Sequence, residues 1–404
     1  MADPGRLSRS AAILLASRSV RAFGDGFTAL LLPAYMTALG FSPVRIGLLT
    51  TATLLGSAGL TLMTGLLAHR APARTLLCCA CGLMLATGLA FSQARGFWPL
   101  TVVAFVGTLN PSGGDLSLFL PLEQSLLAHA GTERSRTSLF AWFALAGALS
   151  VAAGALFIGA LEPMTRALGM NLLDAMRALF ALYGLLAVAA FVLYLFLPGS
   201  KTADDPPRAP LGPSRNRVLA IAALFGLDSF GGGFVVQSML ALWLFHRFGL
   251  SLAAAGSFFF WSGLLSAASF LVAGWLGRRI GLINTMVFTH IPANLCLAAA
   301  AFVPNLGGVM ALLLVRAAFS SMDQPVRTSY VMAIVTPAER AAAAGVTNVP
   351  RSLAAAVSPW LSGLMLGASA FAWPLLIGGT LKTVYDLLLL LAFRRIRPPE
   401  ETGR

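Results

Sequence analysis

The chain has 404 residues, of which 57% are apolar and only 11% are charged. Soluble domains carry about a quarter charged residues, so this composition excludes a water-exposed globular protein and predicts an integral membrane protein. The net charge of +13 would indicate nucleic-acid binding in a soluble chain, but in a membrane protein it is explained by basic loops that set the orientation, and no nucleic-acid partner is expected.

Apolar runs separated by Pro, Gly and charged residues predict the membrane-spanning helices. At about 20 residues for each helix plus short loops, the chain accommodates about twelve. In chain order the expected spans are 12–39, 46–67, 74–93, 98–122, 138–160, 172–197, 217–245, 252–275, 282–303, 308–334, 341–367 and 372–393. The expected fold class is therefore an all-α integral membrane protein.

A polar, Pro-rich stretch divides these spans into two sets of six. It predicts an N-terminal six-helix bundle in residues 1–198, a linker in 199–216 and a C-terminal six-helix bundle in 217–404. If the N-terminus is cytoplasmic, most of the loop arginines fall on the inside, as the positive-inside rule requires. We therefore expect the linker and both termini on the cytoplasmic side of the cell's inner or plasma membrane.

Loop motifs of the first half return in the second half. Gly40-Phe-Ser-x-x-x-x-Gly47 returns as Gly249-Leu-Ser-x-x-x-x-Gly256, and Gly65-Leu-Leu-Ala-His-Arg70 returns at the same spacing as Gly274-Trp-Leu-Gly-Arg-Arg279. Such matches predict that six helices were duplicated to give two pseudo-symmetric bundles.

Two six-helix halves joined by a cytoplasmic linker resemble the major facilitator superfamily of secondary transporters, over residues 12–394. The segment 65–74 is similar to the superfamily's signature, with His69 in place of the usual acid; Arg278 holds that place in the second copy. The resemblance implies a cavity at the membrane midplane and transport by alternating access. It also implies gating roles for four cytoplasmic arginines, Arg70, Arg74, Arg278 and Arg279. The segments 323–327 and 337–340 resemble bacterial efflux members.

Charged side chains inside the spans are the candidate functional residues, because each costs about 2.5–3.5 kcal/mol in mid-membrane. Two polar stripes at helical spacing predict that the first and tenth helices line the transport path. The first stripe consists of Arg18, Arg21, Asp25, Thr28 and Tyr35, and the second of Arg316, Ser320, Asp323, Arg327 and Tyr330. The alternative interpretation is that these charges form structural pairs or reach outward from the helix ends.

Four acids are candidates for proton coupling. Asp228 and Asp115 have no cation within helical reach, so we rank them first. Asp25 follows Arg21 and Asp323 precedes Arg327 by four residues, so both are expected to be held ionised. Lys382 and Asp386 are expected to form a structural pair one turn apart on the last helix.

The candidate substrate-binding residues are mostly arginines, which pair with carboxylate or phosphate groups. They are Arg21, Arg316, Arg327, Arg351, Asn348, Asn110 and Tyr35. The four histidines, His69, His129, His246 and His290, are expected in loops or at span ends. No metal and no cofactor is expected.

The predicted function is proton-coupled export of a small organic compound, acidic or amphipathic, by a transporter that the resemblance implies is a monomer in contact with membrane lipids. The first alternative is a uniporter or exchanger of an organic anion or oxyanion conjugate, using an arginine-lined cavity. A polytopic membrane enzyme is a remoter alternative, since the sequence contains none of the usual catalytic motifs. A non-transporting receptor built on the same fold is equally remote and would bind its ligand without flux.

Overall fold

The computed structural model describes residues 8–67, 71–113, 118–130, 133–198, 212, 214–323, 326–327, 330–331, 335–336, 339–369 and 371–393. These residues form helices, turns and loops, with no strand among them, which confirms the all-α expectation. The helices of the N-terminal part are α1 (Arg9–Ala38), α2 (Pro43–Leu67), α3 (Ala73–Gln93), α4 (Phe97–Val106), α5 (Phe119–Ala130), α6 (Glu133–Phe157), η1 (Ile158–Ala160), α7 (Leu161–Leu168) and α8 (Leu172–Leu195). Those of the C-terminal part are α9 (Arg215–Gly233), α10 (Gln237–Phe248), α11 (Leu252–Ile280), α12 (Leu282–Ala300), α13 (Leu306–Ser320), α15 (Arg340–Ala368) and α16 (Trp373–Phe393).

Eight segments of the described chain are both long enough and apolar enough to cross a membrane. They are Pro43–Thr64, Ala73–Gln93, Ser138–Ala167, Leu172–Leu195, Arg215–Phe248, Leu252–Gly277, Leu282–Ala300 and Trp373–Phe393. Helices α1 and α15, with 30 and 29 residues, also exceed the roughly 20 residues that a span needs. Polar and charged side chains, among them Arg18, Arg21 and Asp25, lower the hydropathy of α1.

Three expected spans are interrupted. The span 217–245 is divided into α9, which ends at Gly233, and α10, which begins at Gln237. The span 98–122 ends as a helix at Val106, and a second helix starts only at Phe119. Gly107 leaves the helical conformation, and Gly113 has a φ of 72° that favours glycine. The span 308–334 stops at Ser320, so the expected continuous stripe of the tenth helix is wrong: Arg316 lies before a turn, and Asp323 and Arg327 lie in helical residues after it.

Helix ends follow local capping chemistry. Ser8, Asn171 and Asn305 each accept a hydrogen bond from a backbone N–H three residues on, at the starts of α1, α8 and α13. Gly249 ends α10 in the left-handed conformation, with a φ of 58°. The loop glycine of the repeated motif therefore terminates a helix.

The chain packs as two compact units. Unit 1 consists of Met1–Phe41, Ala52–Asp204 and Leu250–Phe260, and unit 2 consists of Ser42–Thr51, Asp205–Gly249 and Trp261–Arg404. Helices α2 and α11 contribute residues to both units. The bundle boundaries at 198 and 217 stay a prediction.

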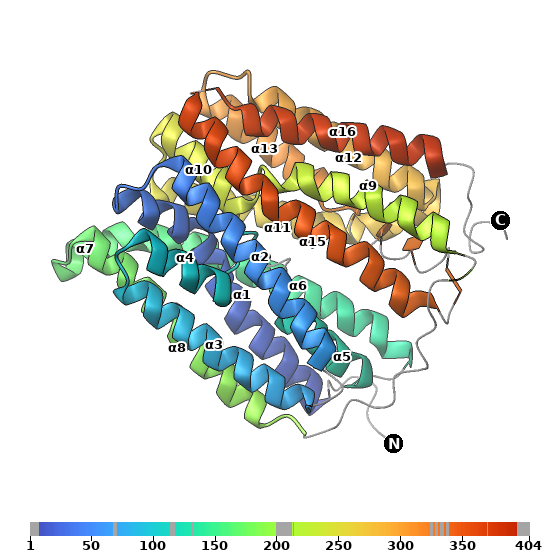
Figure 1. Cartoon of the computed structure of the whole chain (residues 1–404), viewed down its shortest axis with the longest axis horizontal. Helices are drawn as coiled ribbons and strands as arrows, with labels where there is room; N and C mark the ends of the chain where they lie inside the picture. The colour runs from blue at the N-terminus through green and yellow to red at the C-terminus, as the bar shows by residue number, and fades with distance from the viewer. Residues whose placement is uncertain are drawn as a thin grey trace. The chain divides into compact units, whose positions relative to one another are not determined.

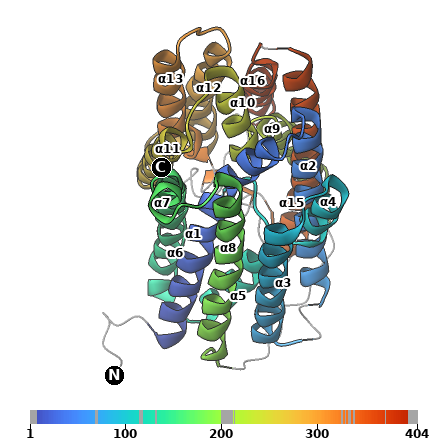
Figure 2. The same ribbon diagram turned by 90° about the vertical axis from the view of Figure 1, so that its left-hand side faces the viewer.

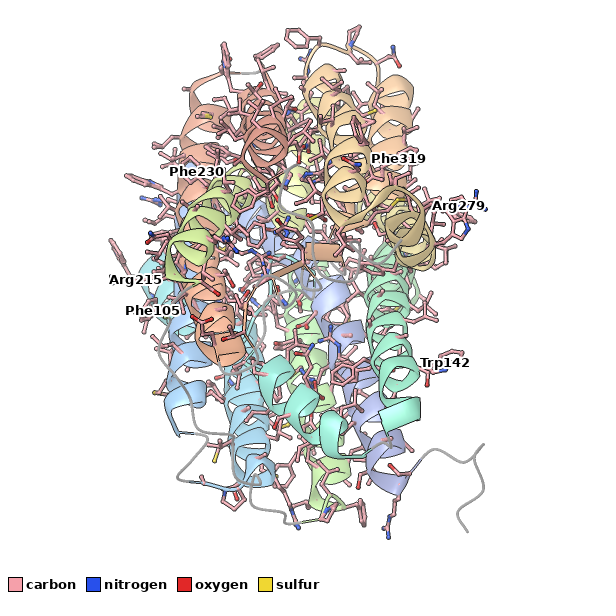
Figure 3. The ribbon with its side chains drawn as sticks, turned by 90° about the vertical axis from the view of Figure 1, so that its right-hand side faces the viewer. Phe105, Trp142, Arg215, Phe230, Arg279 and Phe319 are labelled. Carbon is pink, nitrogen blue, oxygen red and sulfur yellow. The ribbon has the colours of Figure 1, made fainter. Side chains whose placement is uncertain are left out.

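In unit 1, α1 packs against α6 and α8, and α3 packs against α8, as Figures 1 and 2 show along the helices. Gly26 and Gly154 allow α1 and α6 to approach, because a Cβ at either would lie 2.1 Å or 2.0 Å from a carbonyl oxygen of the other helix. Large apolar side chains cover the outside. Trp142 of α6, which is 61% exposed, projects away from the helices in Figure 3.

In unit 2, α9 packs against α15 and α16, and α12 packs against α13 and α16. Gly379 of α16 brings that helix onto α12, since a Cβ there would lie 2.7 Å from the Asn294 carbonyl oxygen. An apolar core that includes Phe225, Met286 and Leu389 surrounds the charged residues described next.

Candidate functional site

Asp228 on α9 is the centre of a buried polar cluster in unit 2. Lys382 Nζ of α16 lies 2.6 Å from Asp228 Oδ1, and Arg327 Nη2 lies 2.8 Å from Asp228 Oδ2. These tertiary partners overturn the ranking of Asp228 as a first candidate for proton coupling, although no cation lies within reach on its own helix. Neither partner shares its helix, so spacing along the sequence could not reveal them.

Arg327 links this carboxylate to a second one. Its guanidinium also forms an ion pair with Asp323, four residues earlier, as the sequence predicts. The cation lies 4.8 Å from the Phe225 ring centroid and 5.9 Å from that of Tyr385. Two carboxylates and two aromatic rings thus stabilise one buried cation.

The expected pairing of Lys382 with Asp386 is wrong. Lys382 bonds to Asp228, whereas Asp386 accepts hydrogen bonds from α12. His290 Nδ1 lies 2.9 Å from Asp386 Oδ1, and Asn294 Nδ2 lies 2.9 Å from Asp386 Oδ2. His290 is 2% exposed and lies inside α12, so the expectation that it occupies a loop or span end is also wrong.

Two half-buried arginines of unit 2 have no carboxylate within ion-pair distance in the described part of the chain. Arg351 on α15 donates from Nε to Ser229 Oγ at 3.2 Å and from Nη1 to Asn348 Oδ1 at 3.4 Å. Arg316 on α13 has a buried Nε with no acceptor among the described residues. Asp228 interacts with both arginines electrostatically at longer range.

A second polar cluster lies in unit 1, around Glu123. Arg21 Nη2 forms an ion pair with Glu123, and Arg21 Nε donates to Tyr194 Oη at 3.1 Å. Tyr194 Oη donates to Glu123 Oε1 at 2.6 Å, and Ser17 Oγ donates to the same oxygen at 3.4 Å. The Arg21 guanidinium also lies 3.9 Å from the Phe119 ring centroid. Every member of this network is buried.

Asp25 is also buried in unit 1, but Arg21 does not bond to it. Asp25 is 4% exposed, and its carboxylate makes no hydrogen bond or ion pair with the residues that the structure describes. The expectation that Arg21 holds Asp25 is wrong, because Arg21 turns to Glu123 of α5. Thr28 bonds to its own helix, at the Gly24 carbonyl. Asp115 lies outside the described residues.

The two remaining binding candidates of unit 1 take part in local structure. Tyr35 donates to the Ala94 carbonyl oxygen at 3.2 Å and packs edge-on against Phe180. Asn110 lies in the break after α4 and accepts from the Ser112 N–H at 3.1 Å, while its buried Nδ2 has no acceptor in the described chain. Asn110 therefore retains a donor, and Tyr35 has its hydroxyl engaged.

The arginines of the repeated motif have separate surroundings. Arg74 donates to the Leu197 carbonyl oxygen at 3.2 Å, which ties α3 to the chain after α8. Arg279 lies over Trp275, 4.9 Å from its ring centroid, and projects outward in Figure 3. Arg70 and the side chain of Arg278 lie outside the described residues.

Glu339, just before α15, joins that helix to the start of α9. Its carboxylate accepts from Gly212 N at 2.6 Å, from Ser214 Oγ at 2.9 Å and from Thr336 Oγ1 at 2.7 Å. These bonds, that of Thr336 first, lower the pKa of Glu339 to about 2, because hydrogen bonds favour the ionised carboxylate. Glu339 thus connects the last residues before α9 to the beginning of α15.

Sequence reasoning missed Glu123, Tyr194 and His290. Glu123 falls one residue beyond the expected end of the fourth span, because the break in that span shifts the helix onward. An acid within the apolar run Phe119–Ala130 was the available signal. Tyr194 and His290 carry no signal of their own, since single polar residues on apolar helices are common.

Among the described residues, no group of three or more His, Cys, Asp or Glu side chains could hold a metal ion. The chemistry of both clusters is that of charge pairing within helical bundles.

Solved structures share this fold. A bacterial homolog of the human lysosomal transporter Spinster, in an inward-facing and unoccupied conformation, matches with a TM-score of 0.75 at 15% identity, over 97% of this chain and 98% of that chain. The nucleoside transporter NupG matches with a TM-score of 0.72 at 15% identity, over 95% and 99%. The human organic anion transporter MFSD10 matches with a TM-score of 0.66 at 16% identity, over 96% and 100%. At these identities the likeness shows the fold.

Sequence comparisons agree. The uncharacterized membrane protein YJR124C of Saccharomyces cerevisiae is 24% identical over 422 residues, which cover 96% of this chain and 94% of that protein. The family model of the Major Facilitator Superfamily matches residues 14–319. The apolar helices and this match make the protein an integral membrane transporter rather than an enzyme. The predicted resemblance is confirmed: the chain belongs to the major facilitator superfamily.

Proposed function

We propose that this transporter carries a small organic anion and couples its movement to protons. The observation that supports the substrate class is the pair of arginines in unit 2, Arg316 and Arg351, that have no carboxylate partner among the described residues. A cation inside the membrane without a counter-charge is costly. An anionic substrate supplies the missing charge.

The surroundings of Arg351 suit it to this role. Its bonds to Ser229 and Asn348 leave its Nη2 group without an acceptor in the described chain, and Asn348 is exposed. The Nη2 group of a guanidinium held in this way can donate a charge-assisted hydrogen bond to a carboxylate, sulfonate or phosphate. Arg327 is a poorer candidate, because Asp228 and Asp323 already neutralise it.

The structural neighbours include transporters of several substrate classes. MFSD10 is described as an organic anion transporter and NupG as a nucleoside transporter. The first description agrees with our proposal, but the proposal rests on the charges of unit 2. The resemblance of segments 323–327 and 337–340 to bacterial efflux members supports export as the direction.

Asp25 is the proton carrier that we propose. Asp228 and Asp323 are paired with cations, whereas Asp25 is buried without a bonded partner in the described chain. A buried carboxylate of this kind binds a proton in one state and releases it in another. Because Arg21 is committed to Glu123, it does not lock Asp25 in the ionised form.

The substrate test uses purified protein in proteoliposomes with a panel of labelled organic anions and matched neutral amphiphiles. We expect Arg351→Gln and Arg316→Gln each to reduce anion flux by at least about tenfold, the loss from one charge-assisted hydrogen bond of roughly 1.5–3 kcal/mol. Arg166→Gln, at an arginine that is 82% exposed on α7, is the matched control. Flux of neutral amphiphiles that is insensitive to both variants would overturn the substrate class.

The coupling test adds a pH-sensitive dye inside the same liposomes. We expect wild type to move protons with the anion, and Asp25→Asn to abolish proton movement while anion counterflow persists. Glu162→Gln, at a surface acid of α7, is the control. Substrate flux without proton movement in wild type would identify a uniporter or an anion exchanger instead.

A further inference from the structure

His290 and Asp386 form a buried pair that the proposed transport cycle does not yet use. The pair joins the middle of α12 to α16, and both side chains are at most 2% exposed. Asn294, one turn after His290, donates to the second oxygen of Asp386. Both oxygens of the carboxylate are therefore held by one face of α12, and the imidazole is fixed in orientation.

The pair is connected to the charged cluster. The ring of Tyr385 lies edge-on to His290, with centroids 6.2 Å apart, and the same ring lies 5.9 Å from the Arg327 guanidinium. Lys382 precedes Asp386 by one helical turn. The other titratable and charged groups on the elements around His290 are Asp228 on α9, Arg316 on α13, Asp323 and Arg327 after α13, and Arg351 on α15.

A purely structural donor to Asp386 would not need to be a histidine, since Asn294 fills that role from the next turn. Histidine is the side chain whose charge ordinarily changes between pH 5 and 8. Its Nδ1 is engaged by the carboxylate, and its Nε2 makes no hydrogen bond with the residues that the structure describes. Nε2 is the atom that can take up and return a proton.

We propose that the His290–Asp386 pair is a second proton-binding site of this protein, in unit 2 and separate from Asp25. With His290 neutral, Asp386 is an anion one turn from Lys382 and competes with Asp228 for that cation. With Nε2 protonated, the pair is neutral overall, and unit 2 carries one more positive charge. One consequence rests on the proposed function: protonated His290 favours anion binding at Arg316 and Arg351. By reciprocal linkage, the bound anion favours protonation.

Proton binding can be measured without any substrate. The full-length protein, labelled with ¹⁵N-histidine, contains four histidines, and the signals are assigned by His69→Gln, His129→Gln and His246→Gln as well as by His290→Gln. We expect the His290 signal to show both the neutral and the doubly protonated form as the pH is varied from 5 to 8.5, and the proportions of the two forms to differ in Asp386→Asn. A His290 signal that keeps one protonation state over this range overturns the site. Assignment by elimination keeps the test valid even if His290→Gln does not fold.

The linkage is tested by equilibrium binding of whichever organic anion the flux panel selects. We expect its affinity to fall by at least about fivefold, the lower end of ordinary coupling, as the pH rises through the His290 transition. In His290→Gln the part of this dependence that follows the His290 transition should be lost, and the part that depends on Asp25 should remain. Unchanged pH dependence in that variant overturns the linkage. If no anion binds at all, the proposed substrate class fails, while the ¹⁵N titration still decides the proton site.

Discussion

Removing one partner of a buried ion pair leaves the other charged in surroundings that cannot solvate it. In the cluster around Asp228, the two cations depend on the Asp228 carboxylate to different degrees. Arg327 has two carboxylates, Asp228 and Asp323, whereas Lys382 bonds only to Asp228 among the described residues. Loss of the Asp228 charge therefore leaves Lys382 unpaired and affects Arg327 less.

We expect Asp228→Asn to destabilise the protein by about 3–5 kcal/mol, the usual effect of breaking a buried pair. The double variant Asp228→Asn, Lys382→Met should recover much of that loss, because it removes the uncompensated charge. Thermal unfolding in detergent measures both. Asp174→Asn, at a half-exposed pair with Arg177, is the control. Equal Tm values for wild type and Asp228→Asn would contradict this account.

At the scale of helices, close crossings depend on single glycines. A Cβ on Gly154 of α6 would lie 2.0 Å from the Phe23 carbonyl oxygen of α1, which forces the two helices apart. Gly82 of α3 has open space around its Cα and is exposed. The two positions have the same residue in the same secondary structure, but only one lies at a crossing.

We expect Gly154→Ala to lower stability by about 1–3 kcal/mol, as overpacking generally does. Gly82→Ala should leave stability unchanged or raise it slightly, because alanine has the higher helix propensity. Unfolding of both variants in the same detergent gives the comparison. Similar changes in stability at the two glycines would show that the close approach of α1 and α6 does not determine the effect of an added Cβ at Gly154.

The contact between Glu339 and the start of α9 predicts a pH effect. Because the pKa of Glu339 is lowered to about 2 from its ordinary 4.5, its contribution to stability is present above about pH 4.5 and is lost as the pH falls towards 2. Glu339→Gln should lower Tm at neutral pH and reduce the decline of Tm between pH 5 and 3. A variant whose Tm falls with pH as steeply as that of wild type would contradict the assignment.

At the scale of the whole molecule, hydropathy and charge predicted the helical class, and the duplicated motifs predicted the superfamily. These signals are local or periodic, so they can be read from a single sequence. The partners of Asp228 come from other helices, more than ninety residues away, and no periodicity records them. The break after Val106 had a signal in the sequence, because Gly107 and Gly113 favour the end of a helix. The apolar composition of the segment nevertheless predicted one continuous span, so the position of Glu123 within a separate helix was not predicted.

The described ion pairs share one property: in each, both members belong to the same unit. Compensating mutations should follow that division. A substitution that damages Asp228 can be rescued at Lys382 or Arg327, and one that damages Glu123 can be rescued at Arg21. Genetic suppressors of a charge defect should therefore be found within the unit that carries the defect, so that each unit is free to accumulate its own changes.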